Sequence, residues 1–412
     1  MRGRIAAAGP EAILGSQKAS VFAKNRFAHA VATLPFSQLV RPLALLLAIL
    51  AASIALAEDH PTLPLGSVAP DFDLPGVDGK NHTLAEYQDA KLLAVVFTCN
   101  HCPTAQAYEE RIKDLVRDYR AKGVAVIAIS PNSPAAVRAD ELGYTDLGDD
   151  LDDMKARAKE RGYNFPYLYD GETESASLKY GPVATPHVFL FDRQRVLRYR
   201  GRIDDAERLD LVKSRDLRNA MDDLLEGKEP RLKDTKVFGC STKWAGKTDT
   251  NARWLEKVHK EPVTLATADA AALKVLRENK GTGKLRLISV WSTRCGPCVA
   301  EFDDFVDTRL RFRQRDFELV TVAAQMPDEK DMVLKFLQKR HSSAKNLIYG
   351  ETDEDKLTEA LDPEWKGPLP HTLLVAPDGK VLYRHTGEVD FLELRRKIVP
   401  ALNAITPWPG MK

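Results

Sequence analysis

Two Cys-x-x-Cys pairs, each at the end of an apolar strand-like run, constrain the fold of this chain more than any other feature. The pairs are Cys99 with Cys102 and Cys295 with Cys298, and a helix-like segment follows each. A sulfur at such a junction lies at a helix N-terminus, where free N–H groups and the helix dipole favour the thiolate. The second sulfur, one turn further on, is close enough to form a disulfide with the first. These positions predict thiolate attack followed by resolution by the second cysteine.

Composition narrows the class of protein. The chain has 412 residues and five cysteines, and four of these form the two pairs. A disulfide-stapled scaffold uses more cysteines in a shorter chain. The net charge of +1 gives no electrostatic reason to expect a nucleic-acid partner. Ordinary usage, 44% apolar and 29% charged, predicts a folded protein of two or three domains.

The chain repeats one plan of strands and helices twice. In each copy the strand before the cysteine pair leads into a helix and a second buried strand, and the copy closes on an antiparallel hairpin. Residues 181–201 also align with residues 367–387. This alternation predicts an α/β fold with a mixed β-sheet flanked by helices in each copy. The predicted elements are strands at 92–98, 124–130, 167–169, 188–192, 196–200, 285–291, 317–324, 372–376 and 380–385, and helices before Gly123 and at 154–161, 299–312, 332–340 and 391–403.

The first 57 residues have the anatomy of an export leader. Residues 42–57 carry no charge, follow Arg41 and end in Ala-Leu-Ala. A helix of this length spans about 24 Å, less than the roughly 30 Å hydrocarbon core of a bilayer. We therefore expect a cleaved signal peptide and a protein that is exported to the periplasm or another extracytoplasmic space. An uncleaved leader would make it membrane-anchored.

The remaining chain divides into two domains and a linker. We expect the first domain at residues 58–245, the linker at 246–261 and the second domain at 262–412. The division falls within residues 227–262, which are polar and irregular in pattern.

The dipeptide inside the first pair, Asn100-His101, favours redox chemistry. A histidine at this position stabilises a neighbouring thiolate by charge or hydrogen bonding, which makes the reduced form more stable and the pair more oxidising. Metal binding stays open as an alternative, because Cys99, His101 and Cys102 would form a soft-ligand set with Cys240. An inert structural pair is the other alternative.

Cys240 is the odd cysteine of the five. One interpretation is a buried small apolar residue. The other is a third redox thiol that exchanges with the Cys99–Cys102 disulfide.

The second pair has a dipeptide suited to a tight turn, Gly296-Pro297, and a positive neighbour in Arg294. Redox activity is favoured for Cys295 and Cys298, with an inert structural disulfide or a metal ligand as alternatives.

Residues 291–298 resemble the thioredoxin superfamily, in particular its exported TlpA-like thiol–disulfide oxidoreductases. The resemblance implies a role in proton handling for Glu301. It also implies that Pro370 is the family's cis-proline, which packs against the disulfide and presents backbone to the substrate. The chain departs from the family at Arg294, where an aromatic residue is usual, and at Phe302, near where a proline is common.

The first copy resembles the redoxin (AhpC/TSA, peroxiredoxin-like) branch of the same superfamily, at residues 66–74 and 97–103. Pro186 fits its cis-proline position, and residues 238–244 are similar to the C-terminal end of the same subgroup. Together the two resemblances cover nearly all of the chain after the leader. They imply two tandem thioredoxin-like domains.

A peroxidase is the enzymatic alternative. Peroxiredoxins carry Pro-x-x-x-Thr-x-x-Cys, in which the threonine hydroxyl contacts the thiolate or the peroxide. Counting back from Cys99, the threonine and proline positions hold Val96 and Leu92; counting back from Cys102, they hold Cys99 and Val95. The motif is missing in both registers, which disfavours peroxidase activity.

We therefore predict an exported thiol–disulfide oxidoreductase that reduces or exchanges disulfides. The predicted site residues are the nucleophiles Cys99 and Cys295, the resolving cysteines Cys102 and Cys298, Glu301, and the groove prolines Pro186 and Pro370. We expect no cofactor beyond the redox-active disulfides and no metal. The expected partners are protein thiol or disulfide substrates and an electron donor, with no nucleic acid, and a membrane only through an uncleaved leader. The alternatives are a peroxidase and a non-enzymatic metal-handling or cytochrome-assembly chaperone.

Overall fold

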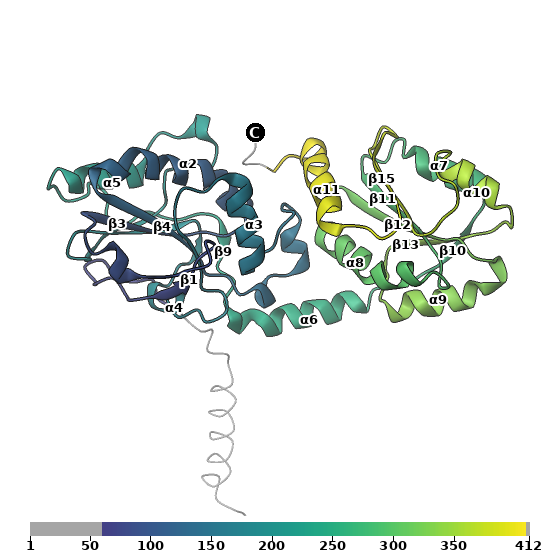
Figure 1. Cartoon of the computed structure of the whole chain (residues 1–412), viewed down its shortest axis with the longest axis horizontal. Coiled ribbons are helices and arrows are strands. Elements are labelled where there is room, and N and C mark those ends of the chain that lie inside the picture. The colour runs from purple at the N-terminus through teal and green to yellow at the C-terminus, as the bar shows by residue number, and fades with distance from the viewer. Residues whose placement is uncertain (1–59, 409–412) are drawn as a thin grey trace, which may run out of the picture. The chain divides into compact units, whose positions relative to one another are not determined.

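The computed structural model describes residues 60–408 and contains two large mixed β-sheets (Figure 1). In the first sheet, β3 (Leu92–Phe97) lies at the centre, parallel to β4 (Val124–Ser130) and antiparallel to β7 (His187–Phe191). The edges are β5 (Tyr167–Tyr169) and β8 (Leu197–Gly201). The mixed sheet expected from the alternation of strands and helices is confirmed.

Helices cover both faces of this first sheet. On one face, α2 (Pro103–Tyr119), α3 (Leu151–Arg161) and α5 (Asp216–Leu225) pack against alternate residues of the central strands. On the other face lie α4 (Ser177–Tyr180) and strand β1 (Asp73–Pro75). Because successive strand residues point to opposite faces, continuous apolar strands such as β3 are buried on both sides.

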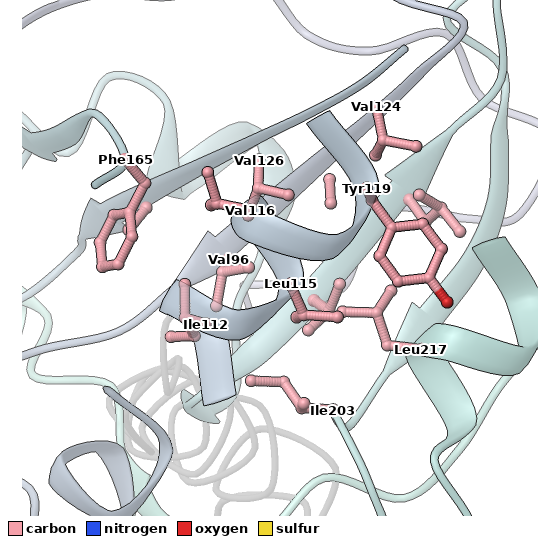
Figure 2. Packing of buried hydrophobic residues seen from close by; sticks show 14 of the residues in the cluster. Val96, Ile112, Leu115, Val116, Tyr119, Val124, Val126, Phe165, Ile203 and Leu217 are labelled. Atoms are coloured by element: carbon pink, nitrogen blue, oxygen red, sulfur yellow. The ribbon is translucent and has the colours of Figure 1, made fainter. Parts of the chain in front are cut away.

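The apolar residues from which the helix before Gly123 was predicted form the face of α2 that packs on the sheet (Figure 2). Its apolar residues recur at three- and four-residue spacing and therefore share one face. Burial of each such side chain contributes about 1.5–3 kcal/mol. Gly123, with φ of +88°, follows the last helical turn, as the sequence predicts. The side chains packed here include Ile112, Leu115, Val116 and Tyr119 of α2, with Val96, Val124, Val126, Phe165, Ile203 and Leu217.

Two short sheets complete the first half. One pairs β1 with β2 (Asn81–Thr83), and the other pairs β6 (Ala184–Thr185) with β9 (Cys240–Ser241). The second pairing brings a segment that is distant in sequence next to the end of β6. Single turns of 3-10 helix lie at Leu84–Tyr87, Arg120–Lys122, Pro134–Ala136, Ala139–Leu142, Leu209–Leu211, Ala245–Lys247 and Pro327–Glu329.

The second sheet repeats the arrangement of the first. Its strand β11 (Leu285–Trp291) runs parallel to β12 (Phe317–Ala323) and antiparallel to β14 (His371–Val375). The outer strands are β13 (Lys345–Tyr349), β10 (Ala266–Ala268) and β15 (Val381–Thr386).

Helices flank the second sheet as well. One face carries α7 (Ala270–Glu278) and α10 (Glu354–Leu361). The other carries α8 (Gly296–Phe312), α9 (Lys330–Lys339) and α11 (Phe391–Ile405).

The segment between the two copies is irregular in its first part but not in its second, which corrects the interpretation of residues 227–262. It contains α6 (Thr248–His259), a helix in which Val258 is the one buried residue. This helix was not predicted from the sequence. The domain boundaries at 245/246 and 261/262 remain predictions. The helices absent from the expectations are α4, α5, α6, α7 and α10, and the absent strands are β1, β2, β6, β9, β10 and β13.

The leader predicted at residues 1–57 lies outside the described residues. Within residues 60–408, no helix combines the length and apolar character needed to cross a membrane.

Candidate functional site

The first cysteine pair lies in the buried loop between β3 and α2. Cys102 precedes the first turn of α2, and Pro103 occupies the first helical position. Cys99 is 4% exposed and Cys102 is fully buried. Both sulfurs contact Thr185: the Cys99 sulfur lies 3.1 Å from its hydroxyl oxygen, and the Cys102 sulfur lies 3.3 Å from its carbonyl oxygen. The bond from Thr185 to Pro186 is cis, so this predicted groove proline follows directly on the residue that contacts both sulfurs.

A buried ion pair holds the dipeptide between the two cysteines. His101 Nδ1 lies 2.5 Å from one carboxylate oxygen of Asp149, and both side chains are buried. The same carboxylate accepts hydrogen bonds of 2.9 Å from the backbone N–H groups of Asn100 and His101, and one of 2.8 Å from the Asn132 amide. Asp149 thus fixes both the backbone and the side chain of the dipeptide.

This ion pair keeps both groups charged. Burial alone would lower the pKa of His101, but the charge and hydrogen bond of Asp149 outweigh it and raise that pKa. Burial alone would raise the pKa of Asp149, but the charge and hydrogen bond of His101 outweigh it and lower that pKa. His101 Nε2 is buried and has no hydrogen-bond partner among residues 60–408. An imidazolium is therefore held directly beside the first pair.

The surroundings of the two sulfurs shift their pKa values in opposite directions. Burial would raise the pKa of Cys102, but hydrogen bonds with Cys240 and Cys99 and the charge of His101 hold it well below its usual range. Burial, the hydrogen bond with Cys102 and the charge of Asp149 raise the pKa of Cys99. The thiolate is therefore favoured on Cys102, whereas the sequence assigned the nucleophile to Cys99.

Cys240 lies at this same site. In the pairing of β6 with β9 it stands opposite Thr185, and its backbone N–H lies 3.2 Å from the Cys102 sulfur. Gly239 makes the approach possible: its φ is +138°, and a Cβ there would lie 2.0 Å from the Thr185 carbonyl oxygen. Cys240 is only partly buried, unlike the pair.

Ligand atoms suitable for a metal ion also meet here. Those of Cys99, His101 and Asp149 lie within 4.8 Å of one another. The sequence named Cys99, His101, Cys102 and Cys240 as a soft-ligand set, and the structure brings these four together with Asp149 as an added carboxylate.

The second pair lies at the junction of β11 with α8. Cys295 precedes the first turn of α8, forms a disulfide with Cys298, and accepts the Cys298 N–H at 3.3 Å on its sulfur. Cys295 is partly exposed, whereas Cys298 is 1% exposed. An approaching sulfur therefore reaches Cys295 first. Arg294 is exposed and forms an ion pair with Glu329.

Trp291, Glu301 and Pro370 surround the second pair. The Trp291 ring packs on Phe302, with ring centroids 4.6 Å apart. Glu301 is 7% exposed; one carboxylate oxygen accepts the Val389 N–H at 2.9 Å, and the other is buried without a partner among residues 60–408. Burial, above all, raises the pKa of Glu301. The peptide bond before Pro370 is cis, and Leu369 packs on the cluster that contains Cys298.

A cavity of about 290 Å³ lies next to this second pair. It runs between the loop before Cys295 and the loop before Pro370. Its walls include Ser292, Arg294, Gln325, Tyr349, Trp365 and Leu369.

Two residues of the first site were not predicted from the sequence. Asp149 lies in an acidic stretch, residues 140–153. Nothing in that pattern distinguishes the acid that turns inward. Asn132, which orients Asp149, gave no signal either.

Parts of the chain are similar to known proteins. Residues 65–200 match the model of the AhpC/TSA family. The chain is 28% identical over 144 residues to the thiol:disulfide interchange protein CycY of Rhizobium leguminosarum bv. viciae, covering 33% of this chain and 68% of CycY. It is 25% identical over 152 residues to the thiol-disulfide oxidoreductase ResA of Bacillus cereus, covering 37% of this chain and 80% of ResA.

Among solved structures, the chain is similar to a hypothetical protein from Sinorhizobium meliloti 1021. The identity is 37%, with a TM-score of 0.39, and the match covers 45% of this chain and 97% of the other.

Proposed function

The chain contains an AhpC/TSA-family redoxin domain of the thioredoxin superfamily, and from this premise we propose that it is an exported thiol–disulfide oxidoreductase acting through two Cys-x-x-Cys sites. Its relatives include proteins named for thiol:disulfide interchange and thiol-disulfide oxidoreduction, which supports the reaction class. Export is proposed from the uncharged run at residues 42–57 and the Ala-Leu-Ala that ends it.

The observation that carries the proposal is the unequal exposure of the second pair. Cys295 is open at the N-terminus of α8, Cys298 is buried behind it, and a cavity runs alongside. When the pair is reduced, the Cys295 thiolate attacks a substrate disulfide, forms a mixed disulfide and releases one substrate thiolate. Cys298 then attacks the Cys295 sulfur and releases the second substrate thiolate. Two electrons pass to the substrate, and a dithiol donor restores the pair.

Glu301 is suited to take the proton that Cys298 loses during resolution. It lies one helical turn after Cys298, and its free carboxylate oxygen is buried without a partner among residues 60–408. Because burial raises its pKa, the carboxyl group accepts a proton more readily than an exposed glutamate does.

The first site is suited to oxidising a substrate dithiol, whereas the second is suited to reducing a substrate disulfide. The imidazolium of His101 stabilises a thiolate on Cys102, which favours the reduced form and makes the disulfide more oxidising. We therefore assign the Cys99–Cys102 pair the more oxidising potential of the two.

A metal-handling chaperone is the second candidate, favoured by the Cys99, His101 and Asp149 cluster. Cu⁺ or Zn²⁺ bound stoichiometrically by the reduced protein, and lost in Cys99→Ser, would support it. The peroxidase alternative is weaker, because a peroxidatic thiol must be reactive as the thiolate, and Cys99 is buried with a raised pKa.

Single Cys→Ser variants of the full chain test the proposal. With a disulfide-bonded protein as substrate and dithiothreitol as donor, Cys295→Ser should abolish reduction at the second site. Cys298→Ser should accumulate a mixed disulfide through Cys295, visible by mass spectrometry. Each pair's variants serve as matched controls for the other pair. If variants of both pairs keep the wild-type rate, the protein does not act through these cysteines.

A further inference from the structure

We propose that Cys240 is the outer thiol of the first site: it replaces Cys99 as the disulfide partner of Cys102, and the sulfur of this partly exposed cysteine is where the substrate thiol attacks. The inference rests on the proposed function, and deepens it by naming the point of entry.

Because the first pair is buried, a substrate thiol needs a more accessible sulfur to attack. In thiol–disulfide exchange the attacking sulfur must reach the attacked sulfur directly. Cys102 is fully buried and Cys99 is 4% exposed, so a substrate thiol has no path to either sulfur of a Cys99–Cys102 disulfide. The second pair needs no third cysteine, because Cys295 is itself partly exposed.

Contacts place Cys240 next to Cys102, where it can act as the disulfide partner of that residue. Its N–H points at the Cys102 sulfur at 3.2 Å, and its side chain packs on the cluster of Cys99, Cys102 and Ala105. The Cys240 side chain therefore already lies beside the first pair. Cys240 is partly exposed, whereas Cys99 and Cys102 are buried.

The segment that carries Cys240 is anchored on both sides. Gly239 lets the chain pass the Thr185 carbonyl. The Thr242 hydroxyl donates to the Pro182 carbonyl at 2.6 Å, and the Lys243 N–H donates to the Asn132 side chain at 2.9 Å. Because Asn132 also donates to Asp149, one side chain links the Cys240 segment to the His101 ion pair.

The first step is an internal exchange without net redox change. Starting from the Cys99–Cys102 disulfide, the Cys240 thiolate attacks the Cys102 sulfur; the Cys102–Cys240 bond forms and the Cys99–Cys102 bond breaks. Cys99 leaves as a thiolate and takes up the proton that Cys240 gave up.

The second step transfers electrons. A thiolate of a dithiol substrate attacks the sulfur of the partly exposed Cys240, and Cys102 leaves as a thiolate. The second substrate thiol then attacks its own sulfur in the mixed disulfide, and Cys240 leaves and is protonated. The substrate loses two electrons as it becomes a disulfide, the site gains them, and a partner disulfide re-oxidises the site.

The test uses the full chain with Cys295→Ser and Cys298→Ser, so that only the first site reacts. A dithiol peptide should reduce the oxidised parent at least tenfold faster than it reduces the Cys240→Ser variant. Ser241→Ala, the exposed neighbour on β9, is the matched control and should react at the parental rate. A parental rate in Cys240→Ser would overturn the proposal.

A second measurement fixes the pairing independently. With Cys99→Ser added, oxidation followed by peptide mapping should find an intramolecular Cys102–Cys240 disulfide. Finding both thiols free, or bonded only between molecules, would also overturn the proposal. If the parent is not reduced by the peptide at all, the proposed function fails for this site, and the mapping still decides whether Cys240 pairs with Cys102.

Discussion

The carboxylate of Asp149 lies 2.5 Å from Nδ1 of His101, and neither side chain is accessible to solvent. Asp149 acts on the cysteines through His101, which makes it a positioning residue of the first site. The ion pair connects an acidic loop to the dipeptide between two thiols, and the charge of His101 contributes to the stability of a thiolate on Cys102.

Asp149→Asn should raise the pKa of Cys102. The amide keeps the shape of the side chain but removes the negative charge that holds His101 protonated, so the thiolate loses the stabilising charge of His101. The expected shift is on the order of one pKa unit or more, with a less oxidising first pair. A pH titration of thiolate absorbance in the chain lacking the second pair measures it.

Asp152→Asn is the matched control for that change. Asp152 is exposed on α3 and pairs with Lys155, so the Cys102 titration should not move. An unchanged titration in Asp149→Asn would show that Asp149 does not set the charge of His101.

The ion pair should stabilise the fold most between about pH 4 and 6.5. The pKa of His101 is raised on folding, so its contribution is complete below the unfolded value of about 6.5 and is lost as the pH rises through the folded value. The pKa of Asp149 is lowered, so its contribution is present above about 3.9 and is lost as the pH falls through the folded value.

Urea unfolding of the wild type and His101→Asn across this range measures the contribution. The difference in free energy of unfolding should be largest inside the window and decline on both sides. Asp149→Asn should remove the same pH dependence, and a difference that does not vary with pH would contradict the prediction.

Gly239→Ala should detach β9 from β6. The new Cβ would lie 2.0 Å from the Thr185 carbonyl oxygen, so the backbone must move. We expect a loss of about 1–3 kcal/mol in the free energy of unfolding, together with faster alkylation of Cys240. Gly227→Ala is the control: its φ is also positive, at +76°, but its Cβ would meet nothing within 4 Å. Equal losses in both variants would assign the effect to φ alone.

Glu301→Gln should slow the second site without unfolding it. The amide oxygen can still accept the Val389 N–H, but the side chain can no longer take up the proton from Cys298. Resolution of the mixed disulfide should slow about 10²-fold, within the usual range for a general base, while attack by Cys295 is unchanged. Quenched-flow trapping of the mixed disulfide separates the two steps, and Asp331→Asn, an exposed acid on α9, is the control.

The sequence predicted what local pattern controls. The strands at 124–130 and 167–169 agree with β4 and β5, and the periodicity of Ile112, Leu115 and Val116 marks the buried face of α2. Because these elements bury much apolar surface, their sequences contain the apolar patterns from which they can be predicted.

The missed features depend on tertiary contacts. β9 is two residues long and exists because Cys240 pairs with Thr185, a relationship that no local pattern encodes. Asp149 is one acid among several in its loop, and only the folded chain turns it toward His101. For the same reason the sequence left Cys240 unplaced.

The closing of β9 over the first site also sets an order of events during synthesis. Cys102 and Cys240 meet across a separation of 138 residues. A chain emerging from its N-terminus therefore exposes both thiols of the first pair long before the segment that covers them exists. Until the segment around residue 240 has been synthesised, both thiols of the pair are exposed to other thiols and disulfides. The nascent chain can therefore react at a position that is buried in the folded protein.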